Sequence, residues 1–214
     1  MTNHRPVSIT FTQELPSGFF CTDDLIPTAI ARTSKTNTPI ALNCRRRIFS
    51  AGGYFAHSQD FERRLIIETY INNEHVFPDE ETANIFLQLV GRNPKKSQYI
   101  LFMPKYDIKS DVVILLVNAS KASKILGLSA YYGLFDVDVV PAAPTCAAIF
   151  RPLIEPNRIH INFIDYFDRE YQAKGCFEEE EFLVSMRPAL YKKLCVAFTK
   201  SAHGNSKPNG LPIY

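Results

Sequence analysis

Cys44 is the first residue in the chain whose type and position suit a chemical role. It follows the apolar segment Thr38–Leu42, predicted to be a buried strand, and precedes the pair Gly52-Gly53. Ligand sites of open mixed sheets are built at the ends of strands, and glycine allows close approach of backbone to another group. We therefore take Cys44, Gly52 and Gly53 as candidate ligand-binding residues. A buried structural cysteine is the equally weighted alternative.

Cys146 is the second candidate, and the one best placed for reactivity. It lies in the segment Pro144-Thr-Cys-Ala-Ala, which predicts the start of a helix because proline is favoured in a first turn. Unpaired N–H groups and the helix dipole lower the pKa of a thiol at that position. Cys146 is therefore the candidate nucleophile. Packing of its side chain against the core, with Thr145 capping the helix, is the alternative.

Arg169 is the candidate cation. It ends the segment Asp165-Tyr-Phe-Asp-Arg, which follows a predicted strand over 158–163. The two aromatic residues should bury and bring Arg169 inward, where its planar fork suits a carboxylate or phosphate. We predict that it contacts a ligand or Asp165, the alternative being a surface turn whose charges pair with one another.

Other site types have weaker support. A histidine such as His57 or His160 could serve as base for Cys146, and a zinc site made of Cys44, Cys146 and a histidine stays open. The chain has no HExxH, GxGxxG, GxxxxGK[ST] or GxSxG motif, so the residues name no particular cofactor or metal. The acidic run Glu178–Glu181 is typical of a solvated lead into a strand.

Composition restricts the class of protein. The 214 residues are 46% apolar and 21% charged, with a net charge of +2, which fits one globular domain over 1–200 and a loose tail over 201–214. So small a charge predicts no nucleic-acid partner. The longest apolar run, Val112–Val117, is too short to cross a membrane. Five cysteines without CxxC spacing, and a start without a signal-like segment, predict a cytoplasmic protein.

Alternating and helical periods interleave along the chain, which predicts an α/β fold with a mixed sheet flanked by helices. No internal repeat is evident. Strands are expected over 7–11, 38–42, 97–103, 111–117, 137–140, 158–163 and 182–186, and helices over 25–34, from 79 to Gly91, over 120–128 with an end at Gly127, from 144, and over 188–198.

The order of several segments resembles an uncharacterised prokaryotic family, domain of unknown function 169, from about Val7 to Phe198. The segments are Cys44 with the later Gly-Gly-Tyr-Phe, Pro78-Asp-Glu-Glu, Tyr99–Pro104, Asp111–Asn118, Pro144–Ala148 and Asp165–Arg169. The resemblance implies that Cys44 and Cys146 occupy the family's two recurrent cysteine positions, Gly52-Gly53 its glycine segment and Arg169 its arginine. It implies no activity.

Three hypotheses follow. In the first, a pocket lined by Cys44, Gly52, Gly53, Cys146 and Arg169 binds a small ligand or redox cofactor. In the second, the protein is a thiol enzyme with Cys146 as nucleophile. In the third, it is an interaction protein without a catalytic site. None of them fixes the oligomeric state.

Overall fold

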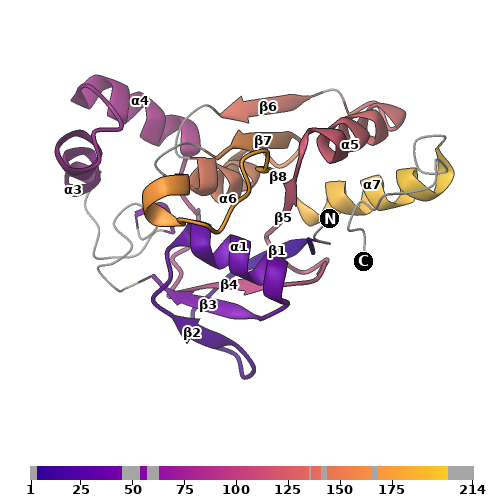
Figure 1. Cartoon of the computed structure of the whole chain (residues 1–214), viewed down its shortest axis with the longest axis horizontal. Helices are drawn as coiled ribbons and strands as arrows, with labels where there is room; N and C mark the ends of the chain where they lie inside the picture. The colour runs from indigo at the N-terminus through magenta and orange to yellow at the C-terminus, as the bar shows by residue number, and fades with distance from the viewer. Residues whose placement is uncertain are drawn as a thin grey trace.

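The computed structural model describes residues 4–44, 54–56, 63–134, 136–140, 144–164 and 168–201 (Figure 1). Gly52, Gly53, His57 and Asp165, all named above, lie outside these ranges, as does the tail from residue 202. Within the described ranges, no helix has the length and apolar character needed to cross a membrane.

The described strands form one eight-stranded mixed sheet, which confirms the α/β fold. Its order is β2-β3-β4-β1-β5-β8-β7-β6, and only the outermost pairs, β2 with β3 and β6 with β7, are parallel. The strands are β1 (Val7–Thr12), β2 (Phe20–Thr22), β3 (Ile40–Asn43), β4 (Tyr99–Met103), β5 (Val112–Val117), β6 (Val137–Val140), β7 (Ile159–Phe163) and β8 (Phe182–Met186).

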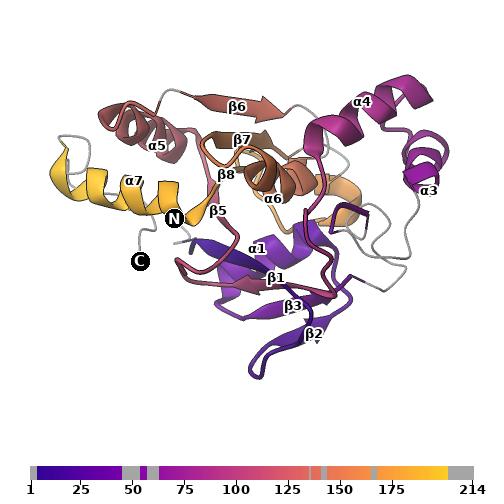
Figure 2. The ribbon, with the colours of Figure 1, turned by 180° about the vertical axis from the view of Figure 1, so that it is seen from behind.

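Helices cover both faces of the sheet. They are α1 (Ile26–Thr36), α3 (Arg63–Glu68), α4 (Glu80–Val90), α5 (Ala119–Tyr131), α6 (Pro144–Ile154) and α7 (Pro188–Lys200), with π-helical turns η1 (Thr69–Asn73) and η2 (Asp168–Gln172). Figures 1 and 2 show α5 beside α7 at one end of the molecule and α3 beside α4 at the other.

Capping residues explain where several helices begin. Asp79 accepts a hydrogen bond from the N–H of Thr82 at 2.8 Å, and Asn118 accepts one from Lys121 at 3.1 Å, so each is a side-chain N-cap. Gly91, with φ of +74°, ends α4 as predicted. The expected end of α5 at Gly127 is wrong, because the helix continues to Tyr131.

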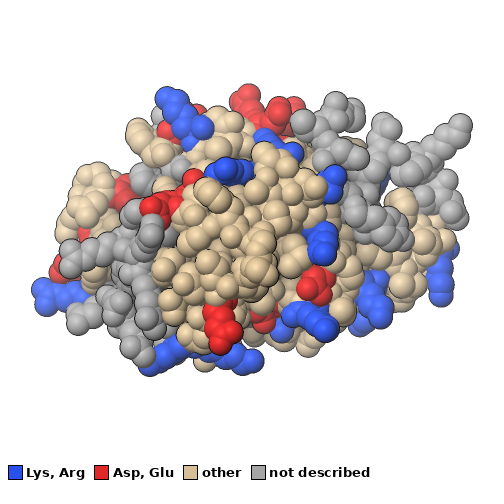
Figure 3. All heavy atoms as spheres, turned by 90° about the horizontal axis from the view of Figure 1, so that it is seen from below, with Lys and Arg blue, Asp and Glu red and all other residues tan. Residues whose placement is uncertain are grey.

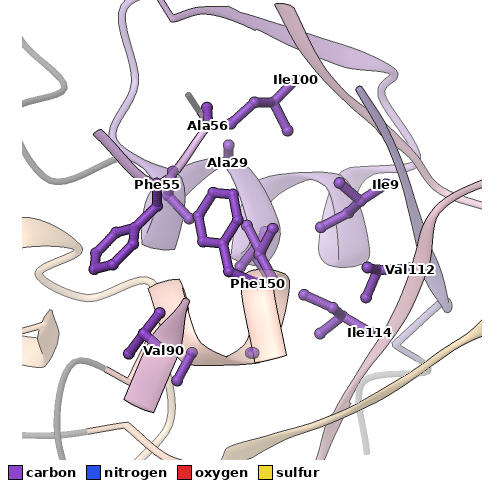
Figure 4. Close-up of a cluster of buried hydrophobic side chains, with 14 of the residues drawn as sticks. Ile9, Ala29, Phe55, Ala56, Val90, Ile100, Val112, Ile114 and Phe150 are labelled. Carbon is purple, nitrogen blue, oxygen red and sulfur yellow. The ribbon is translucent and has the colours of Figure 1, made fainter. Parts of the chain in front are cut away.

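Two hydrophobic clusters fill the spaces on either side of the sheet. The first, here called the α6-side core, joins strand residues such as Ile9 and Ile114 to α1, α4 and α6. Figure 4 shows part of it, with the Phe55 and Phe150 rings close together; their centroids are 5.4 Å apart. The second packs α5 and α7 against β5, β7 and β8. β5 contributes to both clusters, so all six of its residues are buried.

The sheet has a two-fold internal repeat that the sequence analysis missed. When β1 to β4 exchange places with β5 to β8, in that order, the sheet has the same strand order counted from its opposite edge. The same neighbours are also parallel. The centre of the repeat is the antiparallel pair of β1 and β5. One domain is thus assembled from two β-β-α-β-β units, one after the other in the chain.

The strand registers follow the same symmetry residue by residue. In the central pair, Val7 lies opposite Ile114 and Ile9 lies opposite Val112. A two-fold axis midway between these two pairs exchanges the strands and keeps the chain direction of each. Val7 therefore corresponds to Val112, and Ile9 corresponds to Ile114. The outer ladders then agree: β1 and β4 pair from Ser8↔Met103 to Thr12↔Tyr99, as β5 and β8 pair from Val113↔Met186 to Val117↔Phe182.

The helices α1 and α6 correspond in the two units. Each joins the parallel strands of its unit, each has 11 residues, and each has a Pro-Thr pair in its first turn, Pro27-Thr28 in α1 and Pro144-Thr145 in α6. They pack on the same face of the sheet and contact one another (Figure 1). The repeat therefore provides two equivalent strand-helix-strand crossovers, of which the second carries Cys146.

Candidate functional site

Cys146 lies in the first turn of α6, where the sequence predicted it. The short connection from β6 brings the helix N-terminus to the carboxyl end of that strand, which is the edge where open sheets bind ligands. The side chain is half-buried and packs against the α6-side core. Its thiol thus has core on one side and part of its surface accessible.

A buried hydrogen bond fixes this end of α6. The hydroxyl of Thr145 donates to Oδ2 of Asp168 at 2.8 Å, and both side chains are buried. Asp168 begins η2, which follows β7 in the chain. The bond therefore ties the first turn of α6, next to Cys146, to the segment that leaves the sheet after β7.

Cys44 lies in the core just after β3. Its side chain is buried in the α6-side core, and its backbone N–H donates to the carbonyl of Gln98 at 2.8 Å just beyond β3. Burial raises the pKa of its thiol to about 12, since a thiolate is poorly solvated there. At neutral pH Cys44 is a neutral, weakly polar side chain.

The two cysteines belong to one side of the sheet. Cys44 is a member of the α6-side core, and Cys146 packs against that same cluster. That placement is what a pocket lined by both residues requires, although no described contact joins the two thiols. Gly52 and Gly53, the predicted glycine wall, lie outside the described residues.

Thiol reactivity can be ranked from these positions. We expect iodoacetamide at pH 8 to modify Cys146 well before Cys44 or Cys195, because burial raises the pKa of Cys44 to about 12 and that of Cys195 to about 11. Peptide mass spectrometry over a time course measures the order. Replacing the exposed Cys21 with serine removes an unrelated reactive site. Faster labelling of Cys195 than of Cys146 would overturn the ranking.

Arg169 is half-buried, and the contacts described for it are to carbonyls and not to an anion. Its Nε donates to the carbonyl of Ile164 at 3.0 Å, and its two terminal nitrogens donate to the carbonyls of Glu178 and Glu181. The predicted partner Asp165 lies outside the described residues. Arg169 therefore fastens η2 to the turn before β8, a structural role that the sequence analysis did not foresee.

The acidic run Glu178–Glu181 is exposed to solvent only in part. Glu178, Glu179 and Glu180 are exposed, whereas Glu181 is buried and accepts from Nε2 of His4 at 2.5 Å. Nζ of Lys35 lies 3.3 Å from its other oxygen. Although burial acts the other way, the hydrogen bonds from His4 and the Glu178 N–H, with the Lys35 charge, hold the pKa of Glu181 below its usual value.

An open groove of about 500 Å³ borders this run. It is lined by His4, Asn118, Lys121 and Glu178–Glu181. Of the predicted site residues that the structure describes, Cys44, Cys146 and Arg169, none is among these lining residues. On the face seen in Figure 3, acidic and basic side chains are interspersed around a broad area without either.

A buried polar network beneath the other end of α6 was not predicted. Arg151 donates through Nε and Nη2 to Oδ2 of Asp138, at 3.1 and 2.8 Å, through Nη2 to Glu155 at 2.9 Å and through Nη1 to the carbonyl of Leu89 at 2.6 Å. Asp138 also lies 3.1 Å from Nδ1 of His160. The network links β6, β7, α4 and α6.

His160 is therefore a poor candidate for a catalytic base. Its ring is fully buried, and Nε2 lies 3.3 Å from the carbonyl of Glu155 while Nδ1 faces Asp138. Burial is the main cause that lowers the pKa of His160, which favours the neutral ring. Both ring nitrogens lie inside the core, and the single N–H of the neutral ring can donate to only one of these two acceptors. The other predicted base, His57, lies outside the described residues.

Comparison with known protein families matches residues 3–197 to the model of domain of unknown function 169 (DUF169), described as "Uncharacterised ArCR". The chain belongs to the DUF169 family. It matches no curated protein and no solved structure. The match confirms the resemblance seen in the sequence.

Metal binding by this DUF169 protein finds no support among the residues that the structure describes. No group of three or more histidine, cysteine, aspartate or glutamate side chains there is arranged to hold a metal ion. The zinc site of Cys44, Cys146 and a histidine thus gains no third ligand from His160, which faces Asp138 and Glu155.

The buried His160 of this DUF169 protein makes stability depend on pH. Because burial lowers its pKa in the folded state, the unfolded chain binds the proton first as pH falls, so stability drops below about pH 6.5. We expect a loss of up to about 1.4 kcal/mol per pH unit from this residue. Urea denaturation between pH 7.5 and 5 measures the slope. The variant His160→Gln should flatten it, and an unchanged slope would contradict the assignment.

Proposed function

We propose that this DUF169 protein binds a small ligand or redox cofactor at the N-terminal end of α6, with Cys146 in contact with it. The supporting observation is the position of Cys146: half-buried, in the first turn of a helix that connects two parallel strands. That is the place where α/β sheets bind ligands, since helix N–H groups and strand ends converge there.

The neighbours of Cys146 fit a binding role. The Thr145–Asp168 hydrogen bond holds the helix end in place, and a preorganised site loses less entropy when a ligand binds. Cys44, neutral and packed in the same core, would form part of the wall. Arg169 would act through the turn it fastens, since its fork is occupied by carbonyls.

A thiol enzyme with Cys146 as nucleophile is the second candidate. The helix N-terminus favours it, because N–H groups and the dipole stabilise a thiolate. It also needs a base within about 2.6–3.2 Å of the sulfur. His160 is taken up by the buried network, so the binding role has more support.

The absorption spectrum of the purified protein, recorded together with metal analysis, separates these roles. Absorption above the aromatic band that is lost in Cys146→Ser and kept in Cys195→Ser supports a bound cofactor. A colourless, metal-free protein whose Cys146 forms a covalent adduct with an acyl or thiol-reactive substrate analogue supports the enzyme. A colourless protein with an unreactive Cys146 and no bound mass in native mass spectrometry contradicts both.

A further inference from the structure

The internal repeat allows each core position of one unit to be compared with its counterpart in the other. In the ladder of β3 and β4, Ile40 lies opposite Phe102, as His160 lies opposite Ser185 in the ladder of β7 and β8. Two residues further along, Leu42 corresponds to Asn162.

These corresponding positions differ in polarity. Ile40, Leu42 and Phe102 are buried members of the α6-side core. Their counterparts His160, Asn162 and Ser185 are fully buried too, yet all three are polar. The first unit builds the same ladder from apolar residues, so the fold does not need polar groups there. The second unit has a polar patch beneath α6 that some other requirement must explain.

His160 is satisfied by the network described above, but the other two residues are not. Nδ2 and Oδ1 of Asn162 and Oγ of Ser185 are inaccessible to solvent and have no hydrogen-bond partner among the residues that the structure describes. An amide and a hydroxyl buried in this way are costly unless something pairs with them.

The two unpaired side chains are neighbours. Ser185 lies directly across from His160, and Asn162 is two residues along β7 on the same face. The Cα atoms of such diagonal pairs are about 7–8 Å apart, a separation that short side chains and one or two bridging waters can span together. A serine stands where the first unit has a phenylalanine, and the covering helix carries the buried small residues Ala147 and Ala148. Small residues therefore stand at positions where a buried water would need room.

The chemistry of the patch favours a neutral occupant. Its charged neighbours Asp138 and Arg151 are paired with one another, and the unpaired atoms are an amide and a hydroxyl, which donate as well as accept. We propose that Asn162 and Ser185 hold one or more ordered water molecules beneath α6. This internal site is separate from the ligand proposed at Cys146.

An experimental crystal structure at about 1.5 Å resolution tests the proposal directly. Wild-type protein should show an ordered water within about 2.7–3.2 Å of the Asn162 amide. The variant Asn162→Leu, which installs the residue of the first unit, should lack that water. The control Ile161→Val, on the opposite face of β7, should keep it. A dry amide in the wild type, or one bonded directly to protein groups, overturns the proposal.

A solution measurement keeps the test independent of whether Asn162→Leu folds. Oxygen-17 relaxation dispersion counts internal waters that stay bound for longer than the tumbling time of the protein. Wild-type protein should have at least one more such water than Ser185→Ala, and equal counts would contradict the role of Ser185. Neither result depends on a ligand at Cys146, so failure here leaves the proposed function untouched.

Discussion

Replacing Arg151 with alanine is expected to lower the free energy of unfolding by about 3–5 kcal/mol, the usual cost of removing one partner of a buried ion pair. The Arg151 side chain is 6% exposed and joins Asp138, Glu155 and the Leu89 carbonyl. Its removal leaves the Asp138 carboxylate facing His160 without the guanidinium. Although partial burial acts the other way, hydrogen bonds from Arg151 and His160 now hold the pKa of that carboxyl below its usual value. Urea denaturation at pH 7.5 measures the loss.

Arg158 provides the matched control. It also pairs with two carboxylates, Asp136 at 2.7 Å and Glu155 at 2.7 Å, but its side chain is 40% exposed. We expect Arg158→Ala to cost much less than Arg151→Ala, because exposed ion pairs contribute little to stability. Equal losses for the two variants would show that the buried network adds nothing beyond a surface pair.

Phe150→Ala is expected to lower the free energy of unfolding by a similar amount, about 3–5 kcal/mol. Phe150 is fully buried in α6, with its ring centroid 5.6 Å from that of Phe11 and 5.4 Å from that of Phe55. Figure 4 shows it at the centre of the cluster between helices and strands. Truncation leaves a cavity that surrounding strands cannot close completely.

Phe163→Ala is the control for this second substitution. Phe163 ends β7 on the other face and is 56% exposed. Its removal should change stability by about 0.5 kcal/mol or less. A loss at Phe150 no larger than that at Phe163 would contradict the packing described for α6.

Elements with strong local signals were predictable from the sequence. The apolar run at Val112–Val117 and the alternation at Val137–Val140 and Phe182–Met186 match the observed strands. The start of α6 at Pro144 was also predictable, because proline is favoured in the first turn of a helix. The predicted end of α5 at Gly127 was wrong. The helix continues through this glycine because it buries Ile125 before it and Leu128 after it.

The internal repeat could not be found from the sequence. Val7 and Ile9 have the same residue types as Val112 and Ile114, but Phe11 is matched by Leu116, and the core positions of β3 become polar in β7. A strand tolerates many apolar residues at one position, so pairing registers can persist while residue identity disappears.

Site prediction was limited in the same way. The position of Cys146 in a first helical turn was predicted, because it depends only on residues next to it in the sequence. The partners of Arg169 and Arg151 were not, because Glu178, Leu89 and Asp138 reach them only through the fold. Burial of Cys44, which raises its pKa to about 12, likewise depends on helices far away in sequence.

The central claim, that a small ligand contacts Cys146 at the end of α6, is tested most directly by native mass spectrometry of the purified protein. The account predicts a wild-type mass above that of the polypeptide, with the excess released on denaturation. Cys146→Ser should reduce the bound fraction, and the control Cys195→Ser, in α7, should leave it unchanged. A wild-type mass equal to that of the bare chain, or an excess that Cys146→Ser does not alter, would contradict the account.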